Sequence, residues 1–255
     1  MSKVNIYAKD GKAAGEATLP AVFSTDYRPD LIRKSVNAFQ ANRRQPYGSD
    51  TMAGKRHSEY SVRSGSGISR VPRLSQGNTA VLSPAVVGGR RAHPPKVERI
   101  WAEKVNKKER ALALKSALAA TANAEIVRGR GHRFKEGLAL PVVLADEVTA
   151  LGKTKDVVAL FEAVGLGDDI ARALDGHKQR PGKGKLRGRR MRTPSSVLLV
   201  VDDLAAPVAA AAKNLRGVEV TTPRELNVER VAPGGDPGRL TVFTKKALAA
   251  LEAIG

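Results

Sequence analysis

Residues 197–201, Val197-Leu198-Leu199-Val200-Val201, are a continuous aliphatic run, and the acidic pair Asp202-Asp203 follows directly. A strand with apolar side chains on both faces is typical of a parallel sheet that helices cover on both sides. This run therefore predicts a buried strand and an α/β fold.

Strand and helix patterns alternate along the chain on either side of this run. Repeated strand–helix units predict a mainly parallel sheet flanked by helices, a Rossmann-like body. A further short helix is expected from Pro223 and a last helix up to Ile254. The other expected strands are residues 4–8, 141–145, 218–220 and 240–243, and the other expected helices are 30–42, 106–127, 154–164, 168–175 and 207–214.

Several of these elements have recognisable end signals. Asn106, with Glu109 three positions on, has the spacing of a capping box, and Thr154 and Thr244 are expected to cap their helices. Gly165 is expected to end a helix in the left-handed conformation. In the first helix, Phe39 falls on the same apolar face as Leu31, Ile32 and Val36.

Positive charge is concentrated in three segments. The 255 residues include 44 Lys and Arg against 25 Asp and Glu, a net charge of +19. Residues 43–99 hold eleven bases and three acids, residues 128–135 hold four bases, residues 177–192 hold eight bases, and the last two segments hold no acid. The rest of the chain is nearly neutral. A neutral body with three basic segments indicates a polyanionic partner, because uncompensated positive charges repel each other.

Residues 43–99 also differ from the rest in composition, with seven Gly, five Pro and eight Ser. Such a segment buries too little apolar surface to offset its ordering entropy, so we expect it to be mobile until a partner binds. The predicted organisation is one globular α/β domain, residues 1–42 and 100–255, with a long internal loop at 43–99 and a basic extension at 177–192.

The residues that enzymes use are not found in suitable patterns. The absence of cysteine excludes disulfides and thiolate chemistry and fits a reducing compartment. The glycine pairs at 65–67, 129–131 and 182–184 complete neither a dinucleotide-binding nor a P-loop motif. We expect no cofactor, no metal, no membrane segment and a cytoplasmic location. The four histidines are expected to face RNA or solvent rather than to catalyse: His57, His93, His132 and His177.

Few aromatic residues accompany the basic ones; Tyr47, Tyr60 and Phe134 are the examples. Proteins that stack single-stranded bases have interleaved aromatics, whereas Arg, Lys and Gly suit contact with a folded phosphate backbone. The residues expected to bind RNA are Arg43, Arg44, Lys55, Arg56, Arg63, Arg70, Arg73, Arg90, Arg91, His93, Lys96, Arg128, Arg130, Arg133, Lys135, Lys178, Arg180, Lys183, Lys185, Arg187, Arg189, Arg190 and Arg192.

Several stretches, in order along the chain, resemble the family of large-subunit ribosomal protein four, in its archaeal and eukaryotic form. Their joint order along the chain makes the resemblance strong. The stretches are residues 65–67 (GSG), 69–73 (SRVPR), 88–95 (GGRRAHPP), 104–108 (KVNKK), 113–118 (ALKSAL), 182–190 (GKGKLRGRR) and 240–244 (LTVFT).

The resemblance implies a structural protein of the large ribosomal subunit that binds its RNA and supports assembly. Residues 43–99 would be inserted into RNA, and their tip would help line the peptide exit tunnel beside ribosomal protein twenty-two and the nascent peptide. The implied tip residues are Arg63, Ser64, Gly65, Ser66, Gly67, Arg70 and Arg73.

Two other functions remain open at this point. A Rossmann-like RNA-modifying enzyme, such as a methyltransferase, would place Asp202 near its cofactor; a polar turn at the end of the strand is the more economical interpretation of Asp202-Asp203. A DNA-binding architectural protein would also carry this charge, although no helix-turn-helix pattern is visible.

Overall fold

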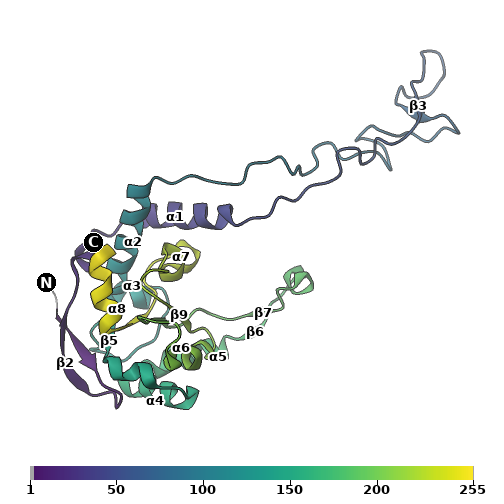
Figure 1. Cartoon of the computed structure of the whole chain (residues 1–255). Helices are drawn as coiled ribbons and strands as arrows, with labels where there is room; N and C mark the ends of the chain where they lie inside the picture. The colour runs from purple at the N-terminus through teal and green to yellow at the C-terminus, as the bar shows by residue number, and fades with distance from the viewer. Residues whose placement is uncertain (1–2, 255) are drawn as a thin grey trace. The chain divides into compact units, whose positions relative to one another are not determined.

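The structure is a computed structural model that describes residues 3–254, and the chain divides into two compact units (Figure 1). Ala41–Glu103 forms one unit, called here the loop unit. The rest of the described chain forms the other, called here the sheet unit.

A six-stranded mixed sheet forms the centre of the sheet unit. Its order is β2-β1-β5-β10-β8-β9, and every neighbouring pair is parallel except β1 and β2. The predicted α/β class and mainly parallel sheet are therefore confirmed. The strands are β1 (Lys3–Tyr7), β2 (Ala13–Thr18), β5 (Val142–Leu144), β8 (Leu198–Val200), β9 (Glu219–Thr221) and β10 (Thr241–Thr244).

The order of the strands differs from that of a Rossmann fold. In the doubly wound order the first strand of the chain lies in the middle of the sheet. Here the middle position between β5 and β8 is taken by β10, the last strand of the chain, and β1 lies next to the edge. The sheet is mainly parallel and flanked by helices, as predicted, but its strand order is not the doubly wound one, because local patterns give strand identity and not strand order.

Helices cover both faces of this sheet (Figure 1). The α-helices are α1 (Pro29–Asn42), α2 (Lys107–Thr121), α3 (Ala124–Gly129), α4 (Thr154–Val164), α5 (Gly167–Asp175), α6 (Pro207–Lys213), α7 (Val228–Val231) and α8 (Lys245–Ala250). The short 3-10 helices are η1 (Ala21–Ser24), η2 (Asp146–Ala150), η3 (Lys183–Arg187), η4 (Pro233–Gly235) and η5 (Leu251–Ile254).

Successive side chains of the central strands point to opposite faces and build two hydrophobic clusters. Val142 and Leu144 of β5 pack in one cluster with α4 and α6, whereas Val143 packs in the other with α1, α2 and α8. Because both faces are covered, the continuous aliphatic run at 197–201 is buried throughout. This burial explains why these strands lack the alternating polar pattern.

The structure corrects several predicted elements. Strand β2 was not predicted, because its sequence, Ala-Ala-Gly-Glu-Ala-Thr, is mostly exposed and has no apolar alternation. The helix expected over 106–127 is two helices, which meet at Asn123; its side chain accepts hydrogen bonds from the amides of Glu125 and Ile126. Phe39 is 45% exposed, although Ile32 and Val36 on the same helix are fully buried.

The helix-end predictions have a mixed outcome. Gly165 ends α4 with φ of +95°, and the Thr244 hydroxyl accepts a hydrogen bond from the Ala247 amide, so both are confirmed. Asn106 makes no side-chain cap, and α4 is preceded by Lys153 rather than capped by Thr154, so those two are wrong. No helix begins at Pro223. The next helix, α7, begins at Val228 after Asn227, whose side chain accepts from the Arg230 amide.

Candidate nucleic-acid interface

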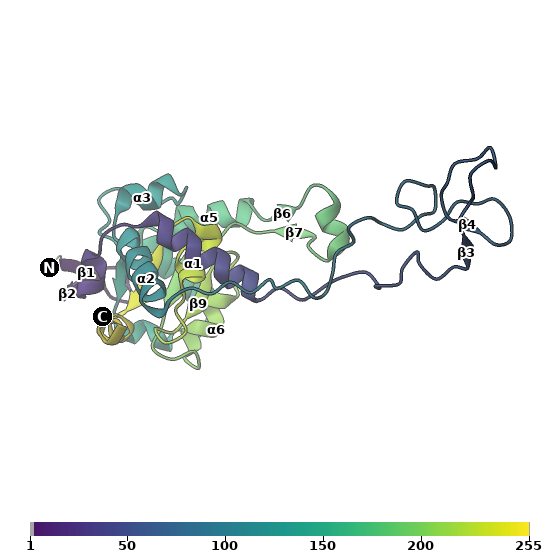
Figure 2. The ribbon, with the colours of Figure 1, turned by 90° about the horizontal axis from the view of Figure 1, so that it is seen from above.

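The loop unit consists of two limbs (Figure 2), and hydrogen bonds join one limb to the other. The Glu103 amide donates to Asn42 Oδ1 at 2.8 Å, and the Ser49 amide donates to the Pro95 carbonyl at 3.0 Å. Further along, β3 (Glu59–Tyr60) pairs with β4 (Arg73–Leu74) as two short antiparallel strands. These contacts hold the limbs beside each other with almost no regular secondary structure.

The one tryptophan of the chain lies between two arginines of the loop unit. The guanidinium carbons of Arg44 and Arg99 are 4.3 and 4.2 Å from the centre of the Trp101 ring. Cation–π contacts of this kind contribute about 0.5–1 kcal/mol each at exposed sites. The stack therefore connects the two limbs. Sequence reasoning did not single out Trp101 or Arg99; the signal available was a tryptophan two positions after an arginine.

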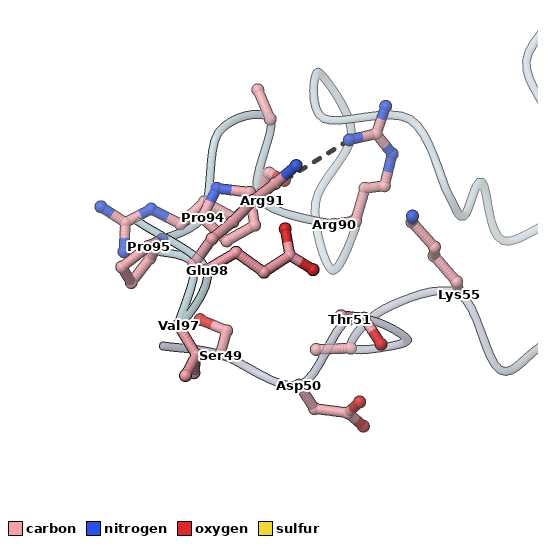
Figure 3. A pocket seen from close by; sticks show the side chains of 13 residues that line it. Ser49, Asp50, Thr51, Lys55, Arg90, Arg91, Pro94, Pro95, Val97 and Glu98 are labelled. Atoms are coloured by element: carbon pink, nitrogen blue, oxygen red, sulfur yellow. Dashed lines mark hydrogen bonds between the residues drawn. The ribbon is translucent and has the colours of Figure 1, made fainter. Parts of the chain in front are cut away.

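A cavity of about 330 Å³ lies between the limbs (Figure 3). Lys55 lines it from the outgoing limb, and Arg90 and Arg91 line it from the returning limb. Asp50 and Glu98 line it as well, so its charge is mixed. The limbs approach closely because of Gly48: a Cβ there would lie 2.9 Å from the Pro95 carbonyl oxygen.

The predicted tip of the loop unit is exposed, and its backbone conformation requires glycine at two positions. Gly65 and Gly67 have φ of +88° and +68°, which other residues rarely adopt. Arg63 and Arg70 are exposed, while Arg73 is half-buried and donates to the Asn78 carbonyl. The tip therefore presents two extended cations on a tight backbone.

Most of the predicted RNA-binding residues in the loop unit are accessible. Arg73 and Arg90 are half-buried, and Arg56 pairs with Asp50. The exposed residues are Arg43, Arg44, Lys55, Arg56, Arg63, Arg70, Arg91, His93 and Lys96.

The second basic segment, residues 128–135, follows α3. Arg128 lies over the buried Phe134 ring, 5.1 Å from its centre, and Arg133 and Lys135 are exposed. Arg130 is different: it is half-buried, and its Nη2 donates to the Pro233 carbonyl at 2.7 Å. Phe134 is thus a core residue rather than a base-stacking one.

The third segment forms a two-stranded unit, called here the basic hairpin, from β6 (Lys178–Gln179) and β7 (Met191–Arg192) with η3 between them. Its strands lie side by side in Figure 2. Arg180 is half-buried and donates to the Arg189 carbonyl; the other Lys and Arg side chains are exposed, and within residues 3–254 none of the eight forms an ion pair. Exposed, unpaired cations of this kind are available to phosphates.

His132 does not face solvent or RNA, which corrects the prediction. It is 5% exposed, and its Nδ1 lies 3.1 Å from both carboxylate oxygens of Asp169. Because an ionised carboxylate only accepts, His132 Nδ1 carries the proton in this contact. The other histidines, His57, His93 and His177, are exposed or half-buried.

Asp169 is the centre of a buried polar network. It also accepts hydrogen bonds from Arg172 Nε at 2.9 Å and from the Ser196 hydroxyl at 2.6 Å. Burial by itself raises the pKa of Asp169, but the hydrogen bonds from His132, Arg172 and Ser196 outweigh it and hold the pKa well below its usual range. This network fixes the position of Arg172.

Arg239 is a second buried charge that the sequence did not reveal. It is 0% exposed; Nη1 donates to Glu219 at 2.8 Å and to the Arg230 carbonyl at 2.9 Å, and Nε donates to the Ser196 carbonyl at 3.0 Å. Burial lowers its pKa, and the charge of Glu219 opposes this shift. Arg239 is a structural residue that joins β9 to the loop before β10.

The acidic pair after β8, Asp202-Asp203, forms a polar turn. This is the interpretation that the sequence favours over a cofactor site. Asp203 Oδ1 accepts a hydrogen bond from the Ala205 amide at 2.9 Å, and both carboxylates are exposed. Residues 3–254 contain no group of three or more His, Asp or Glu that could hold a metal ion. In the same residues, no helix combines the length and the apolar character that a bilayer crossing requires.

An α/β body whose surplus positive charge lies on exposed, largely irregular segments defines the class of polyanion-binding proteins. Comparison with known families makes the assignment specific. Residues 17–254 match the model described as "Ribosomal protein L4/L1 family", and the chain belongs to this family.

Relatives in this family are similar over nearly the whole chain. The chain is 51% identical over 251 residues to large ribosomal subunit protein uL4 of Methanocaldococcus jannaschii, with 98% of each chain covered. It is 50% identical to the protein of the same name from Archaeoglobus fulgidus, with 96% of each covered, and 45% identical to that of Methanosphaera stadtmanae, with 97% and 95% covered.

These matches confirm the predicted resemblance, including its archaeal type. The family consists of ribosomal proteins rather than enzymes, so the prediction that the chain is not an enzyme holds. The alternative of a methyltransferase is not supported.

Proposed function

We infer that the chain is a structural constituent of the large ribosomal subunit, where it associates with the ribosomal RNA. One observation carries this conclusion: about half of the aligned residues are identical to large-subunit proteins, and these alignments cover 96–98% of the chain, so they include both the sheet unit and the loop unit. Since those relatives belong to ribosomes, the chain is a component of the cytoplasmic ribosome and takes part in translation.

The finer proposal concerns how the RNA is held. The sheet unit folds around its own core, and the three basic segments make the contacts with phosphates. Support comes from the exposure of most of the predicted cations and from the absence of ion pairs in the basic hairpin across the described residues. Neutralised RNA strands can then approach each other, which supports assembly of the subunit.

The proposal also assigns residues 43–99 as the loop inserted into RNA, with its tip at the peptide exit tunnel. There it would meet ribosomal protein twenty-two and the nascent peptide. The positive φ angles of Gly65 and Gly67 and the exposure of Arg63 and Arg70 support a narrow cationic tip. The stack of Trp101 between two arginines supports a paired course of the limbs.

We expect the triple substitution Arg187→Ala, Arg189→Ala and Arg190→Ala to weaken RNA binding without unfolding the sheet unit. Each lost phosphate contact lowers the slope of log affinity against log salt by about 0.7–0.9, so the slope should fall by about 2–3. The slope is measured from binding to large-subunit RNA over a series of salt concentrations. Duplex DNA is added as a competitor in a second series, to test the alternative of a DNA-binding architectural protein.

The matched control for this triple variant removes three exposed cations outside the basic segments: Lys153→Ala, Lys155→Ala and Arg224→Ala. It has the same net charge as the test variant. Equal slopes for the wild type and the hairpin variant would contradict the assignment of the hairpin to RNA.

Limited proteolysis tests the role of residues 43–99. We expect cleavage within this segment in the free protein and protection when large-subunit RNA is bound, because its backbone forms few regular hydrogen bonds of its own. The fluorescence of Trp101, the one tryptophan, should change in the same titration. Equal cleavage rates with and without bound RNA would contradict insertion of this segment.

A further inference from the structure

A cavity of about 560 Å³ in the sheet unit is lined by four arginines from separate parts of the chain. Arg33 comes from α1, Arg130 from the second basic segment, Arg172 from α5 and Arg192 from β7. The fold thus joins two of the three basic segments at one concave site. Sequence reasoning did not select Arg33 or Arg172, because neither lies in a basic run.

The acids near this pocket neutralise only part of its charge. Arg172 is paired with Asp169, and its Nη2 also donates to the Ser195 carbonyl at 2.8 Å. Asp236, which lines the rim, is 3.4 Å from Arg33, and both side chains are 67% exposed. Arg130 and Arg192 form no ion pair within residues 3–254.

Arg130 is held in the pocket with a donor unused. Its Nη1 is buried and has no hydrogen-bond partner in the described part of the chain, while Nη2 is taken by the Pro233 carbonyl. Burial lowers the pKa of Arg130, and repulsion from Arg239 and Arg172 lowers it further, against the attraction of Asp236. A buried donor without a partner costs about 1–3 kcal/mol. An anion that reaches this guanidinium would remove both penalties.

We propose that this pocket binds a phosphodiester group of the large-subunit RNA, held between Arg130 and Arg192, with Arg33 at the rim. The guanidinium geometry fits phosphate oxygens in a bidentate way. Gly129 in the lining has no atom within 4 Å of a would-be Cβ, which leaves room for the RNA backbone. The network around Asp169 holds Arg172 in place, so the site is ordered before the phosphate arrives.

This inference rests on the proposed RNA-binding function and makes it specific. If Arg130 and Arg192 hold the same phosphate, their contributions are coupled rather than independent. Two arginines on two different phosphates would each release their own counterions, and their effects on the salt slope would add.

The experiment measures binding of the full chain to large-subunit RNA over a salt series. The variants are Arg130→Gln, Arg192→Ala and the double variant, with Arg224→Ala as an exposed control outside the pocket. Because the site needs both arginines to hold its phosphate, each single variant should lose this one contact, which lowers the slope by about 0.7–0.9 and the affinity about 4-fold at 0.15 M salt. The double variant should lose little more of the salt slope and of the affinity than one single variant. By contrast, Arg130→Gln combined with Arg189→Ala should lose the sum of the two single effects.

The outcomes separate the pocket from the function on which it rests. If the pocket variants keep the wild-type salt slope, or if the losses in the double variant add, the two arginines do not share a phosphate. This result would leave the RNA-binding function of the wild type unaffected. No salt-dependent RNA binding by the wild type would overturn both. If Arg130→Gln fails to fold by circular dichroism, Arg192→Ala alone decides, since its side chain is exposed: a slope lower by about 0.7–0.9 supports the site, and a wild-type slope overturns it.

Discussion

Replacing Asp169 with Asn is expected to lower the free energy of unfolding by about 3–5 kcal/mol, because it removes the charged acceptor at the centre of a buried polar network. Asp169 is fully buried and accepts from His132, Arg172 and Ser196. An amide has one acceptor oxygen instead of two and directs its NH₂ group at donors. Urea denaturation at pH 7 measures the change.

Asp168→Asn is the matched control for this substitution. Asp168 is the neighbouring residue in the first turn of α5 and is exposed, so its loss should change stability by no more than about 0.5 kcal/mol. Similar losses for the two variants would show that the effect belongs to the helix end and not to the buried network.

The pH dependence of this effect has a definite sign. The pKa of Asp169 in the folded state lies below the ordinary value of 3.8, so the folded protein binds this proton less readily than the unfolded chain. The stabilisation is therefore complete above about pH 5 and is lost progressively as the pH falls through and below about 4. The difference in the free energy of unfolding between the wild type and Asp169→Asn should become smaller as the pH falls over that range.

The second large effect concerns the loop unit. Replacing six of its exposed cations with Ser should lower the affinity for large-subunit RNA by about 10³–10⁴-fold at 0.15 M salt, if each meets one phosphate. The fold of the sheet unit should be unchanged, because the substituted side chains are exposed and belong to the loop unit. The substituted residues are Arg43, Lys55, Arg63, Arg70, Arg91 and Lys96.

A control of equal charge removes six exposed lysines from the sheet unit and should keep most of the affinity. An equal loss in both six-fold variants would mean that RNA responds to net charge alone and that the loop unit has no special role. The control residues are Lys9, Lys12, Lys153, Lys155, Lys245 and Lys246.

Local patterns in the sequence were sufficient for the class of fold and for most elements. The aliphatic run at 197–201 predicted a strand buried on both faces. The structure confirms this, because side chains of β8 pack in both hydrophobic clusters, one on each face of the sheet. Segments such as α4 and α6 have apolar spacing and end signals within a dozen residues, so local reasoning finds them. The missed strand β2 has neither, since it is an exposed edge strand.

The sequence by itself determined the α/β class, the three basic segments and the family, because each depends on residues that are near one another along the chain. Tertiary structure alone decided the central place of β10, the burial of His132 against Asp169, and the pocket where Arg33, Arg130, Arg172 and Arg192 meet. These features join residues many positions apart, and their partners are chosen by the packing of the whole core rather than by any local preference.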